Sequence, residues 1–448
     1  MALAIVVLAA GRGTRMVSAQ PKVLHPIAGL PMLFHAMRAA SSLGPEQFIV
    51  VAGFGAQQTT DAVQAHAPYA KIVIQDEQLG TAHAVDQARG LLVDFDGDVI
   101  VLFGDTPFIR PHTLEAMLKA RRAGADFVAL GFEPEDPGRY GRLVVEDGRL
   151  RRIVEAKDAT AEELKIGLCN SGVVCADRKN LFELISQIGC HNAAQEYYLT
   201  DVVEKANDAG LICSVVTCAE EETLGINSRA ELARAEAIFQ NWARQAAMAE
   251  GVTLVAPETV FFAPDTRMAR DVLVEPHVVF GPGVRLDEGA VVRAFSHLEG
   301  CRIRRGAVIG PYARIRPGSS IGEGAKVGNF VETKNTTFEA GAKANHLSYL
   351  GDAHIGAAAN IGAGTITCNY DGVMKHQTEV GAGAFIGSNS ALVAPVSVGA
   401  GAIVAAGSVI THEVPSDALA LSRADQNNKA GGADRLRQRQ RNRKTAAK

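Results

Sequence analysis

Residues 303–328 read IRRGAVIGPYARIRPGSSIGEGAKVG, and an aliphatic side chain stands at every sixth position of this stretch. The same period of six returns near the C-terminus, at Val380, Ile386, Leu392, Val398, Val404 and Ile410. Neither a helix nor an ordinary strand repeats at this spacing. Glycine often follows the aliphatic residue, as at Gly310 and Gly322, and supplies a tight turn. Hexapeptide repeats of this kind predict a parallel β-helix, in which three six-residue faces form one coil around an aliphatic interior.

The period slips twice. The interval from Val327 to Ile355 is 28 residues long (355 − 327), and that from Ile361 to Val380 is 19 (380 − 361), so neither is a multiple of six. We expect a loop or an insertion in each interval. Polar residues such as Asn329, which interrupt the aliphatic columns here, have no use in a pure scaffold.

The first 227 residues show a different pattern, in which short β-branched runs alternate with amphipathic stretches. Strands are predicted at Ala4–Leu8, Phe48–Val51, Lys71–Gln75, Val99–Phe103, Phe127–Gly131 and Ile212–Thr217, and helices at Pro31–Leu43, Gly80–Leu92 and Pro111–Ala123. This alternation predicts an α/β domain with a Rossmann-like, mostly parallel sheet. The runs Arg142–Glu146 and Leu150–Val154 flank Asp147-Gly148, which favours a two-residue hairpin and hence an antiparallel insertion.

A stretch without glycine or proline, residues 228–250, separates the two patterns. Ser228 is well placed as an N-cap, and apolar side chains recur at Leu232, Ala235, Phe239, Trp242 and Ala246. We therefore expect an α/β domain over 1–227, a long connecting helix over 228–250 and a β-helix domain over 251–423. Residues 424–448 are rich in arginine without a hydrophobic repeat, which is typical of a flexible, solvated tail.

Composition narrows the function classes. The 448 residues carry 45 basic and 49 acidic side chains, a balance that argues against a nucleic-acid-coating role and against wholesale disorder. The 7 cysteines are scattered without a C-x-x-C pair, so neither a disulfide framework nor a zinc site is expected. No apolar run approaches the roughly 20 residues of a membrane helix. We expect a cytoplasmic protein without stable membrane insertion.

A glycine-containing loop follows the first predicted strand. Gly11 and Gly13 allow backbone N–H groups to approach an anion, and Arg15 and Lys22 can neutralise phosphate charge. Met16 stands where the dinucleotide fingerprint requires a third glycine, and there is no Walker loop. On glycine spacing alone, a phosphate site and a plain strand-to-helix turn fit equally well.

In combination these motifs resemble the nucleotide-sugar pyrophosphorylases, whose first loop looks like L-x-x-G-x-G-[ST]-R-[ML]. Further matches in order are Gln75, Gln78-Leu-Gly80-Thr81, Gly104-Asp105, Tyr140-Gly141-Arg142, Glu155-Ala-Lys157, Asn170-Ser-Gly172, Glu196–Asp201 and Gly225-Ile-Asn227. Asp105 also follows a predicted strand, where ligands of open α/β sheets gather and a carboxylate can hold Mg²⁺. A helix N-cap is the alternative role for an aspartate at this position.

The resemblance implies a role for each matched residue. Arg15 and Lys22 would stabilise the pyrophosphate and the transition state, and Asp105 and Asn227 would hold Mg²⁺. The UTP and UDP-N-acetylglucosamine site would include Leu8, Ala9, Ala10, Gly11, Gln75, Gly80 and Thr81 around the uracil, and Gly141, Glu155 and Asn170 around the sugar. The residues themselves do not distinguish uracil from thymine.

Together the two halves resemble a family of bifunctional enzymes of bacterial cell-wall precursor synthesis, which combine N-acetylglucosamine-1-phosphate uridylyltransferase with glucosamine-1-phosphate acetyltransferase activity. The resemblance implies His346 as the general base and Glu332 as its orienting or charge-stabilising partner. It also implies sugar-phosphate contacts from Arg316, Lys334, Tyr349, Asn360 and Lys375, and acetyl-CoA contacts from Asn369, Tyr370, Ser388, Ala406 and Arg423. A left-handed β-helix and a homotrimer follow from the same resemblance, and a three-fold arrangement closes heterologous contacts.

Two other readings stay open. The β-helix can be a non-catalytic oligomerisation or allosteric module behind an active nucleotidyltransferase. Alternatively, the whole chain can be a nucleotide-sugar-binding regulator without turnover, although retention of Arg15, Lys22 and Asp105 would then be unexpected. Acetyl transfer tests the first of these readings, and pyrophosphate release tests the second.

Overall fold

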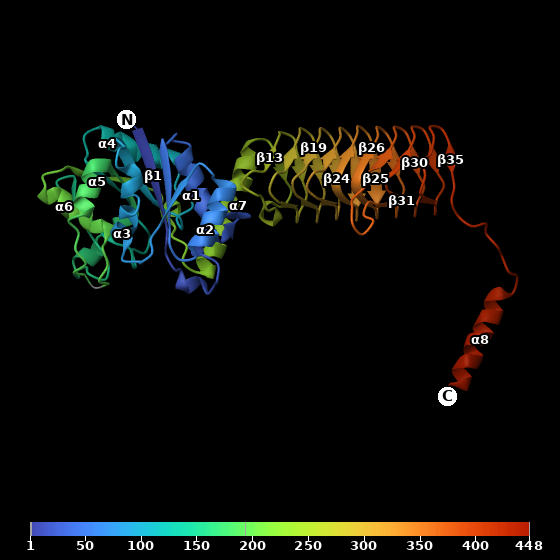
Figure 1. Cartoon of the computed structure of the whole chain (residues 1–448), viewed down its shortest axis with the longest axis horizontal. Coiled ribbons are helices and arrows are strands. Elements are labelled where there is room, and N and C mark those ends of the chain that lie inside the picture. Colours follow the sequence, from blue (N-terminus) through green and yellow to red (C-terminus); the bar gives the residue numbers. More distant parts are fainter. Residues whose placement is uncertain (1, 193, 448) are drawn as a thin grey trace. The chain divides into compact units, whose positions relative to one another are not determined.

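The computed structural model describes residues 2–192 and 194–447. It divides into two compact units, Met1–Trp242 and Ala243–Lys448, which are described separately. In Figure 1, the first unit contains the sheet labelled by β1 and the second contains the repeated short strands from β13 to β35. Among the described residues, no helix has the length and apolar character needed to cross a membrane.

The first unit is built on a nine-stranded sheet. Its main path runs in the order β11 (Cys213–Cys218), β7 (Phe127–Phe132), β10 (Cys169–Asp177), β6 (Gly97–Phe103), β1 (Ala2–Ala9), β4 (Gln47–Ala52) and β5 (Lys71–Ile74). All pairs along this path are parallel except the two that β10 makes with β6 and β7. The predicted strands are therefore confirmed, and β10 is an addition to the prediction. Its Asn170-Ser-Gly segment carries a register shift that masks the strand pattern.

Helices cover both faces of this sheet. Side chains of β1 alternate between two apolar clusters, so that Val6 packs on one face and Ile5 and Val7 on the other. One face contacts α1 (Met32–Ser41), α2 (Ala56–His66) and α4 (Pro111–Arg122), and the other contacts α3 (Thr81–Asp86), α5 (Arg178–Ile185) and α6 (Val202–Asp208). Burial on both faces explains the continuous apolar run of the first strand. The predicted helix over 80–92 is shorter than expected, because a 3₁₀ turn, η3 (Arg89–Leu92), follows α3.

The predicted hairpin is present as β8 (Arg142–Glu146) and β9 (Arg149–Val154), an antiparallel pair joined at Asp147-Gly148. Both turn residues have positive φ, 50° and 72°, as a type I′ turn requires. The short antiparallel pair β2 (Pro26–Ile27) and β3 (Leu30–Pro31) lies outside the main sheet. The long helix predicted over 228–250 is α7, Arg229–Ala249.

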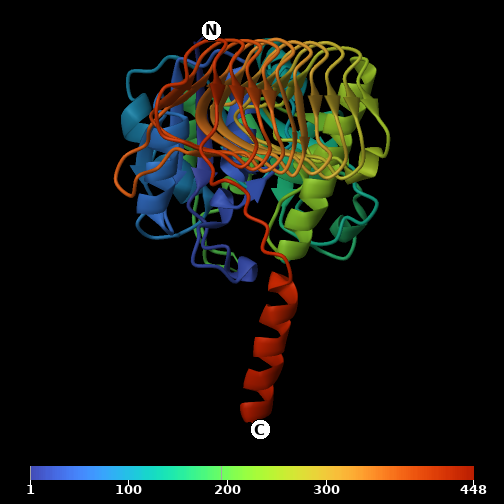
Figure 2. The same ribbon diagram turned by 90° about the vertical axis from the view of Figure 1, so that its right-hand side faces the viewer.

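The second unit is a run of parallel strands that form two sheets of stacked coils. The ten-stranded sheet contains β12 (Thr253–Leu254), β14 (Leu273–Val274), β17 (Val291–Val292), β20 (Val308–Ile309), β23 (Lys326–Asn329), β25 (Lys343–His346), β27 (Asn360–Ile361), β30 (Phe385–Ile386), β33 (Ile403–Val404) and β35 (Leu419–Ala420). The fourteen-stranded sheet contains β13 (Arg267–Met268), β15 (Val279–Phe280), β16 (Arg285–Leu286), β18 (His297–Leu298), β19 (Arg302–Ile303), β21 (Arg314–Ile315), β22 (Ser320–Ile321), β24 (Glu332–Phe338), β26 (Tyr349–Ile355), β28 (Ile366–Cys368), β29 (Thr378–Val380), β31 (Ala391–Val393), β32 (Val396–Val398) and β34 (Val409–Ile410). The stacking is also visible in the turned view (Figure 2). These in-register parallel strands are those of a hexapeptide-repeat β-helix.

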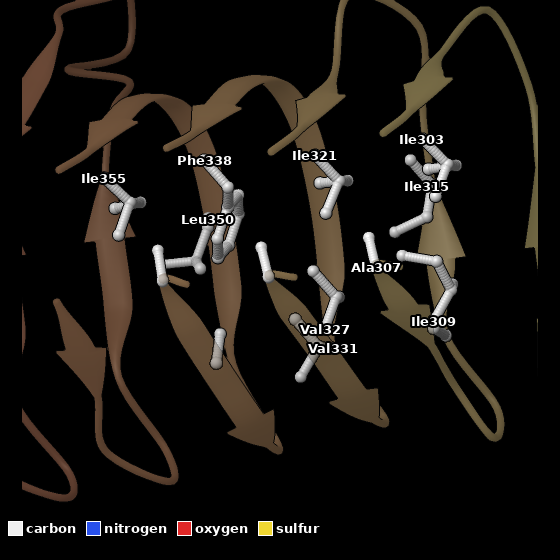
Figure 3. Packing of buried hydrophobic residues seen from close by; sticks show 14 of the residues in the cluster. Ile303, Ala307, Ile309, Ile315, Ile321, Val327, Val331, Phe338, Leu350 and Ile355 are labelled. Atoms are coloured by element: carbon white, nitrogen blue, oxygen red, sulfur yellow. The ribbon is translucent and has the colours of Figure 1, made fainter. Parts of the chain in front are cut away.

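The aliphatic column fills the interior of the coils, as predicted. Ile303, Ile309 and Ile321 are completely buried, and Figure 3 shows them packed inside the strands together with Phe338 and Leu350. A column of this kind is continuous from coil to coil, so each coil buries its apolar face against its neighbours.

The first phase slip is not a loop, which corrects the prediction. Between Val327 and Ile355 the column continues through the buried side chains of Thr333, Phe338, Ala344 and Leu350, so the steps are six, five, six, six and five residues. One face in each of two successive coils is thus one residue shorter, and the strands continue through the interval as β24, β25 and β26. The column was obscured because Thr333 and Ala344 are not aliphatic residues of the expected size.

The second phase slip is an insertion, as expected. Partner residues on successive strands are 17 or 18 positions apart in most of the unit, as for His354 and Thr337. Between His354 and Glu379 the separation rises to 25 positions (379 − 354). The additional residues form an exposed loop after β28, and its tip includes Val373 and Met374, 86% and 62% exposed.

The arginine-rich tail differs from the prediction because it contains a helix, α8 (Gly432–Ala446). None of its residues is buried, and Asp434 in the first turn and Arg443 and Lys444 in the last turn complement the helix dipole. Arginine, glutamine and alanine are good helix formers, so local propensity accounts for an element that has no hydrophobic face.

Candidate active sites

The first candidate site lies at the carboxyl ends of β1 and β6. A cavity of about 270 Å³ is lined by Leu8, Ala9, Ala10, Gly11, Lys22, Val23, Gln75, Gln78, Gly80, Thr81, Ala84, Phe103, Asp105 and Glu196. Every residue that the sequence analysis assigns to the uracil is among them. Strands β4 and β6 lie on opposite sides of β1 in the sheet. Open α/β sheets bind ligands at such a switch point.

Lys22 is the cation at the centre of this site. Its Nζ atom forms an ion pair with Oδ2 of Asp105 and donates a hydrogen bond of 3.0 Å to Oδ1 of Asn227. The two oxygens predicted to hold Mg²⁺ therefore converge on one positively charged atom. Among the described residues no group of three or more histidine, cysteine, aspartate or glutamate side chains forms a metal cluster. Two oxygen ligands suit Mg²⁺, which keeps waters and substrate phosphates as its other ligands.

The start of α7 fixes Asn227. The backbone N–H of Asn227 donates to Oε2 of Glu231 at 2.6 Å, and the N–H of Glu231 donates to Oγ of Ser228 at 3.3 Å. One residue earlier, the N–H of Ile226 donates to the carbonyl of Asp105 at 3.0 Å. These reciprocal bonds resemble a capping box and hold Asn227 next to Asp105. The predicted N-cap role of Ser228 thus contributes directly to the site.

Gln75 closes the other side of the cavity. Its side chain is 3% exposed, and Nε2 donates to the carbonyl of Gly80 at 3.2 Å. Gly80 has φ 118°, and a Cβ atom there would lie 2.5 Å from the carbonyl oxygen of Tyr197. Only glycine fits this close approach. The Glu196–Asp201 motif is therefore packed directly against the loop that carries Gly80 and Thr81.

A second cavity, of about 260 Å³, adjoins the first and shares Thr81 and Phe103 with it. Gly141, Glu155 and Asn170, the predicted sugar contacts, line it together. Burial raises the pKa of Glu155, and the nearby carboxylates Asp158 and Asp201 raise it further. The carbonyl of Gly141 accepts a hydrogen bond of 2.9 Å from the N–H of Asn170, which fixes their spacing.

Arg15 is the exception among the predicted residues of this site. It lies exposed on the 3₁₀ turn η1 (Thr14–Met16) and does not line either cavity. Phe103, Gln78 and Glu196 line the first cavity without having been assigned a role. Gln78 and Glu196 stand in motifs that the sequence analysis quotes, and this was the signal that could have found them.

In the second unit, His346 lies at the end of β25 and is exposed. Its Nδ1 atom is 2.6 Å from Oδ1 of Asn329, the residue in register with it on β23. Because the amide oxygen can only accept, Nδ1 is the donor in this contact, and in the neutral ring Nε2 is then the nitrogen with the free lone pair. A cavity of about 290 Å³ is lined by both residues together with Arg293 and Lys326. Asn329 was missed as the partner of His346, although the polar segment around it was noticed.

Glu332, the predicted partner of His346, pairs elsewhere. Its Oε1 atom accepts a hydrogen bond of 2.9 Å from Nη1 of Arg316, and both side chains are about one-third exposed. No hydrogen bond joins Glu332 to His346 in the part of the chain that the structure describes. The expectation that Glu332 orients His346 or stabilises its charge stays a prediction, and the hydrogen-bond partner of the His346 ring in this structure is Asn329.

Lys334 and Lys375 lie next to each other, although Lys375 belongs to the insertion loop. The neighbouring Lys375 lowers the pKa of Lys334, with Asp352 acting in the opposite direction. A cavity of about 580 Å³ contains Lys375 and Asp352. Two adjacent ammonium groups repel each other, so an anion placed between them would be stabilised. The proximity of these two lysines is compatible with the phosphate contact predicted for them.

Tyr349 and Asn369 meet above Gly351, where a Cβ atom would lie 2.5 Å from the tyrosine hydroxyl and 2.8 Å from the amide nitrogen of Asn369. Gly351 is the register partner of Lys334. Asn360 lies instead on β27, beside β25, which carries His346. The predicted sugar-phosphate residues are thus divided between the two sheets of this unit.

The predicted acetyl-CoA residues Ser388, Ala406 and Arg423 stack at one corner of successive coils. Ser388 accepts a backbone hydrogen bond of 2.8 Å from Gly407, and Nη1 of Arg423 donates to the carbonyl of Ala406 at 2.7 Å. Tyr370 is 60% exposed at the start of the insertion loop, and its hydroxyl donates to the carbonyl of Gly372 at 2.6 Å.

Comparison with known proteins agrees with both halves. Residues 5–200 match the family of MobA-like NTP transferase domains, and residues 300–335 and 377–412 match the bacterial transferase hexapeptide family. The chain is 56% identical to the bifunctional protein GlmU of Jannaschia sp. over 98% of its own length and 96% of that protein. It is 59% identical to GlmU of Cereibacter sphaeroides (100% and 98% covered) and 57% identical to GlmU of Roseobacter denitrificans (97% and 97% covered). Because these relatives match the chain over nearly its full length, the chain belongs to the bifunctional GlmU family.

Proposed function

We propose that this chain synthesises UDP-N-acetylglucosamine in two steps, by acetyl transfer from acetyl-CoA to glucosamine-1-phosphate and then uridylyl transfer from UTP to N-acetylglucosamine-1-phosphate. The observation that supports it most directly is the convergence of Asp105 and Asn227 on Lys22, at the cavity that Gly11 also lines. The full-length likeness to proteins named as bifunctional supports an activity in each unit.

In uridylyl transfer, a phosphate oxygen of the sugar phosphate attacks the α-phosphorus of UTP while pyrophosphate departs in line. The protein contributes mainly orientation and charge neutralisation. Lys22 supplies a positive charge at the phosphates, and Arg15 on its exposed turn supplies a second one. Asp105 and Asn227 would hold Mg²⁺, which would supply further positive charge to the substrate phosphates.

Uracil recognition follows from Gln75. Its Nε2 atom is engaged by the carbonyl of Gly80, so Oε1 remains to accept the N3–H of the base. Cytosine has no proton at N3, so its N3 acceptor would face the Oε1 acceptor of Gln75 without a hydrogen bond. On the sugar side, Gly141, Glu155 and Asn170 contact the N-acetylglucosamine moiety in the adjoining cavity.

In acetyl transfer, Nε2 of His346 accepts a proton from the amine of glucosamine-1-phosphate, and Asn329 holds the ring in the required tautomer. The amine nitrogen attacks the thioester carbonyl carbon, and the thiolate of coenzyme A departs. Lys334 and Lys375 bind the phosphate, with Arg316, Tyr349 and Asn360 as further contacts. The donor lies along Asn369, Tyr370, Ser388, Ala406 and Arg423.

Several wider features belong to the same proposal. Residues 1–227 act as the uridylyltransferase and residues 251–423 as the acetyltransferase, joined by the helix over 228–250. The division of sugar-phosphate residues between two sheets supports a homotrimer, in which a neighbouring subunit completes each site. A left-handed β-helix, a cytoplasmic location and a role in supplying cell-wall precursors accompany this assignment.

The test is to incubate the purified full chain with glucosamine-1-phosphate, acetyl-CoA, UTP and Mg²⁺, and to follow free thiol and pyrophosphate together. Release of both, with thiol independent of UTP, is expected. Asp105→Asn should abolish pyrophosphate release and spare thiol release. His346→Ala should abolish thiol release and should release pyrophosphate only when N-acetylglucosamine-1-phosphate is supplied. Absence of thiol, with pyrophosphate appearing only when N-acetylglucosamine-1-phosphate is supplied, would leave the β-helix a scaffold. Absence of both products even with that substrate would favour a regulator without turnover.

A further inference from the structure

The turn that carries Arg15 is held in an unfavourable backbone conformation. The turn η1 lies between Gly13 and Val17, whose φ angles are 59° and 48°. Positive φ is strained for a β-branched residue and persists only where the surroundings enforce it. The Val17 side chain is 90% exposed and provides no packing of its own. Contacts from elsewhere must therefore keep this turn in place.

One such contact comes from the first residue of α7. Nε of Arg229 donates a hydrogen bond of 3.2 Å to the carbonyl of Met16, immediately before Val17. The Met16 side chain is 1% exposed and anchors the turn from the inside. Arg229 thus reaches back 213 positions along the sequence to the segment that carries Arg15.

The same guanidinium also holds the segment that carries Lys22. Its Nη1 atom is 3.2 Å from Nδ1 of His25, and the backbone N–H of His25 donates to the carbonyl of Lys22 at 3.2 Å. Because arginine can only donate, the imidazole accepts at Nδ1 and is neutral. Burial and the nearby Arg229 charge both lower the pKa of His25, in agreement with this tautomer.

We propose that Arg229 is a positioning residue for uridylyl transfer, which sets the spacing between the Arg15 turn and the Lys22 turn. This inference rests on the proposed function. Arg229 does not line the nucleotide cavity, so it acts through Met16 and His25. A displacement of about 1 Å in groups that align reactants can cost about 100-fold in rate.

The experiment uses Arg229→Gln and Arg229→Ala in the full chain, with Arg149→Gln at the exposed hairpin turn as the matched control. Acetyl transfer by the same polypeptide reports protein concentration and the integrity of the second unit. Calorimetric binding of UDP-N-acetylglucosamine reports whether the nucleotide site remains folded. Because Arg229 is exposed, added millimolar guanidinium can reach the place that Arg229→Ala vacates.

We expect kcat for uridylyl transfer to fall about 10- to 100-fold in both Arg229 variants, with affinity for UDP-N-acetylglucosamine kept within about threefold. Guanidinium should restore part of kcat to Arg229→Ala and leave Arg149→Gln unaffected. Unchanged kcat in Arg229→Gln, loss of product binding in parallel with kcat, or absence of rescue would each overturn the inference. A wild-type chain without uridylyl transfer would instead refute the proposed function itself.

Discussion

Lys22 Nζ and Asn227 Oδ1 lie 3.0 Å apart although 205 positions separate the two residues in the sequence. One comes from the turn after the first strand and the other from the residue before the N-cap of α7. The same ammonium pairs with Asp105 at the end of β6. Three distant segments therefore meet at one charge, which we propose as the centre of nucleotidyl transfer.

Replacement of Lys22 by glutamine should lower kcat for uridylyl transfer by about 10²- to 10³-fold, because a preorganised positive charge at the phosphates is lost. Acetyl transfer by the same chain should be unchanged. Steady-state pyrophosphate release measures the effect, and Lys179→Gln on the exposed start of α5 is the matched control. Equal loss in both variants would contradict the assignment of Lys22.

Replacement of Asn329 by alanine should reduce kcat for acetyl transfer by about 10-fold, which corresponds to the loss of one hydrogen bond to the His346 ring. Replacement of Glu332 by glutamine should not change which ring nitrogen of His346 carries the proton, since Glu332 pairs with Arg316. The two variants should be separated by the pH profile of kcat/KM. A shifted profile in the Glu332 variant alone would support the original expectation instead.

His354 predicts a pH-dependent contribution to stability. Its ring nitrogens lie 3.0 and 2.9 Å from carboxylate oxygens of Glu339 and Glu379. Burial lowers the pKa of His354, but the two glutamates outweigh this and place it above 6.5. The pairing therefore stabilises the folded chain below pH 6.5, and its contribution is lost as pH rises through the raised folded-state pKa.

His354→Gln should thus lower the melting temperature more at pH 6 than at pH 9. The three side chains are more than one-third exposed, so solvent screening limits the expected contribution to about 1 kcal/mol or less. Differential scanning fluorimetry at the two pH values measures the difference, with His297→Gln at an exposed strand position as the control. Equal destabilisation at both pH values would show that the imidazolium form has no role.

Phe338 occupies one of the five-residue faces and is 1% exposed. Its replacement by alanine should reduce the free energy of unfolding by about 3–5 kcal/mol, because the column loses a large aromatic side chain and keeps a cavity. Phe330, in the same coil, is 54% exposed and provides the matched control. Chemical denaturation followed by circular dichroism checks the pair, and similar losses would place Phe338 outside the column.

Much of this arrangement can be predicted from local patterns. The six-residue period depends only on which side chains face the interior, and the first strand depends only on burial on both faces, so both are visible in the sequence. The five-residue faces are not, because Thr333 is polar and Ala344 is small, so neither is recognisable as an interior position. The strand β10 is hidden for a similar reason, since its pattern is broken by the irregular segment at Asn170.

The candidate sites likewise contain residues that local motifs reveal and contacts that they do not. The cavity residues around Gly11 and Gly141 could be found because each stands in a compact motif. The pairing of His346 with Asn329 depends on the register between β23 and β25, 17 positions apart, and no local spacing specifies it. The contact of Arg229 with Met16 is similarly set by the tertiary fold, where α7 returns to the first loop.

The spacing of strand partners also has a kinetic meaning. In most of the second unit a strand pairs with one 17 or 18 positions away, as for Arg302 with Arg285 and Ser320. In the first unit Cys213 pairs with Phe127, 86 positions away (213 − 127). Closing long loops slows folding, whereas stacked repeats can nucleate locally and propagate from coil to coil. The β-helix should therefore fold by successive addition of coils, whereas the sheet of the first unit is complete only when its last strand in the sequence has paired.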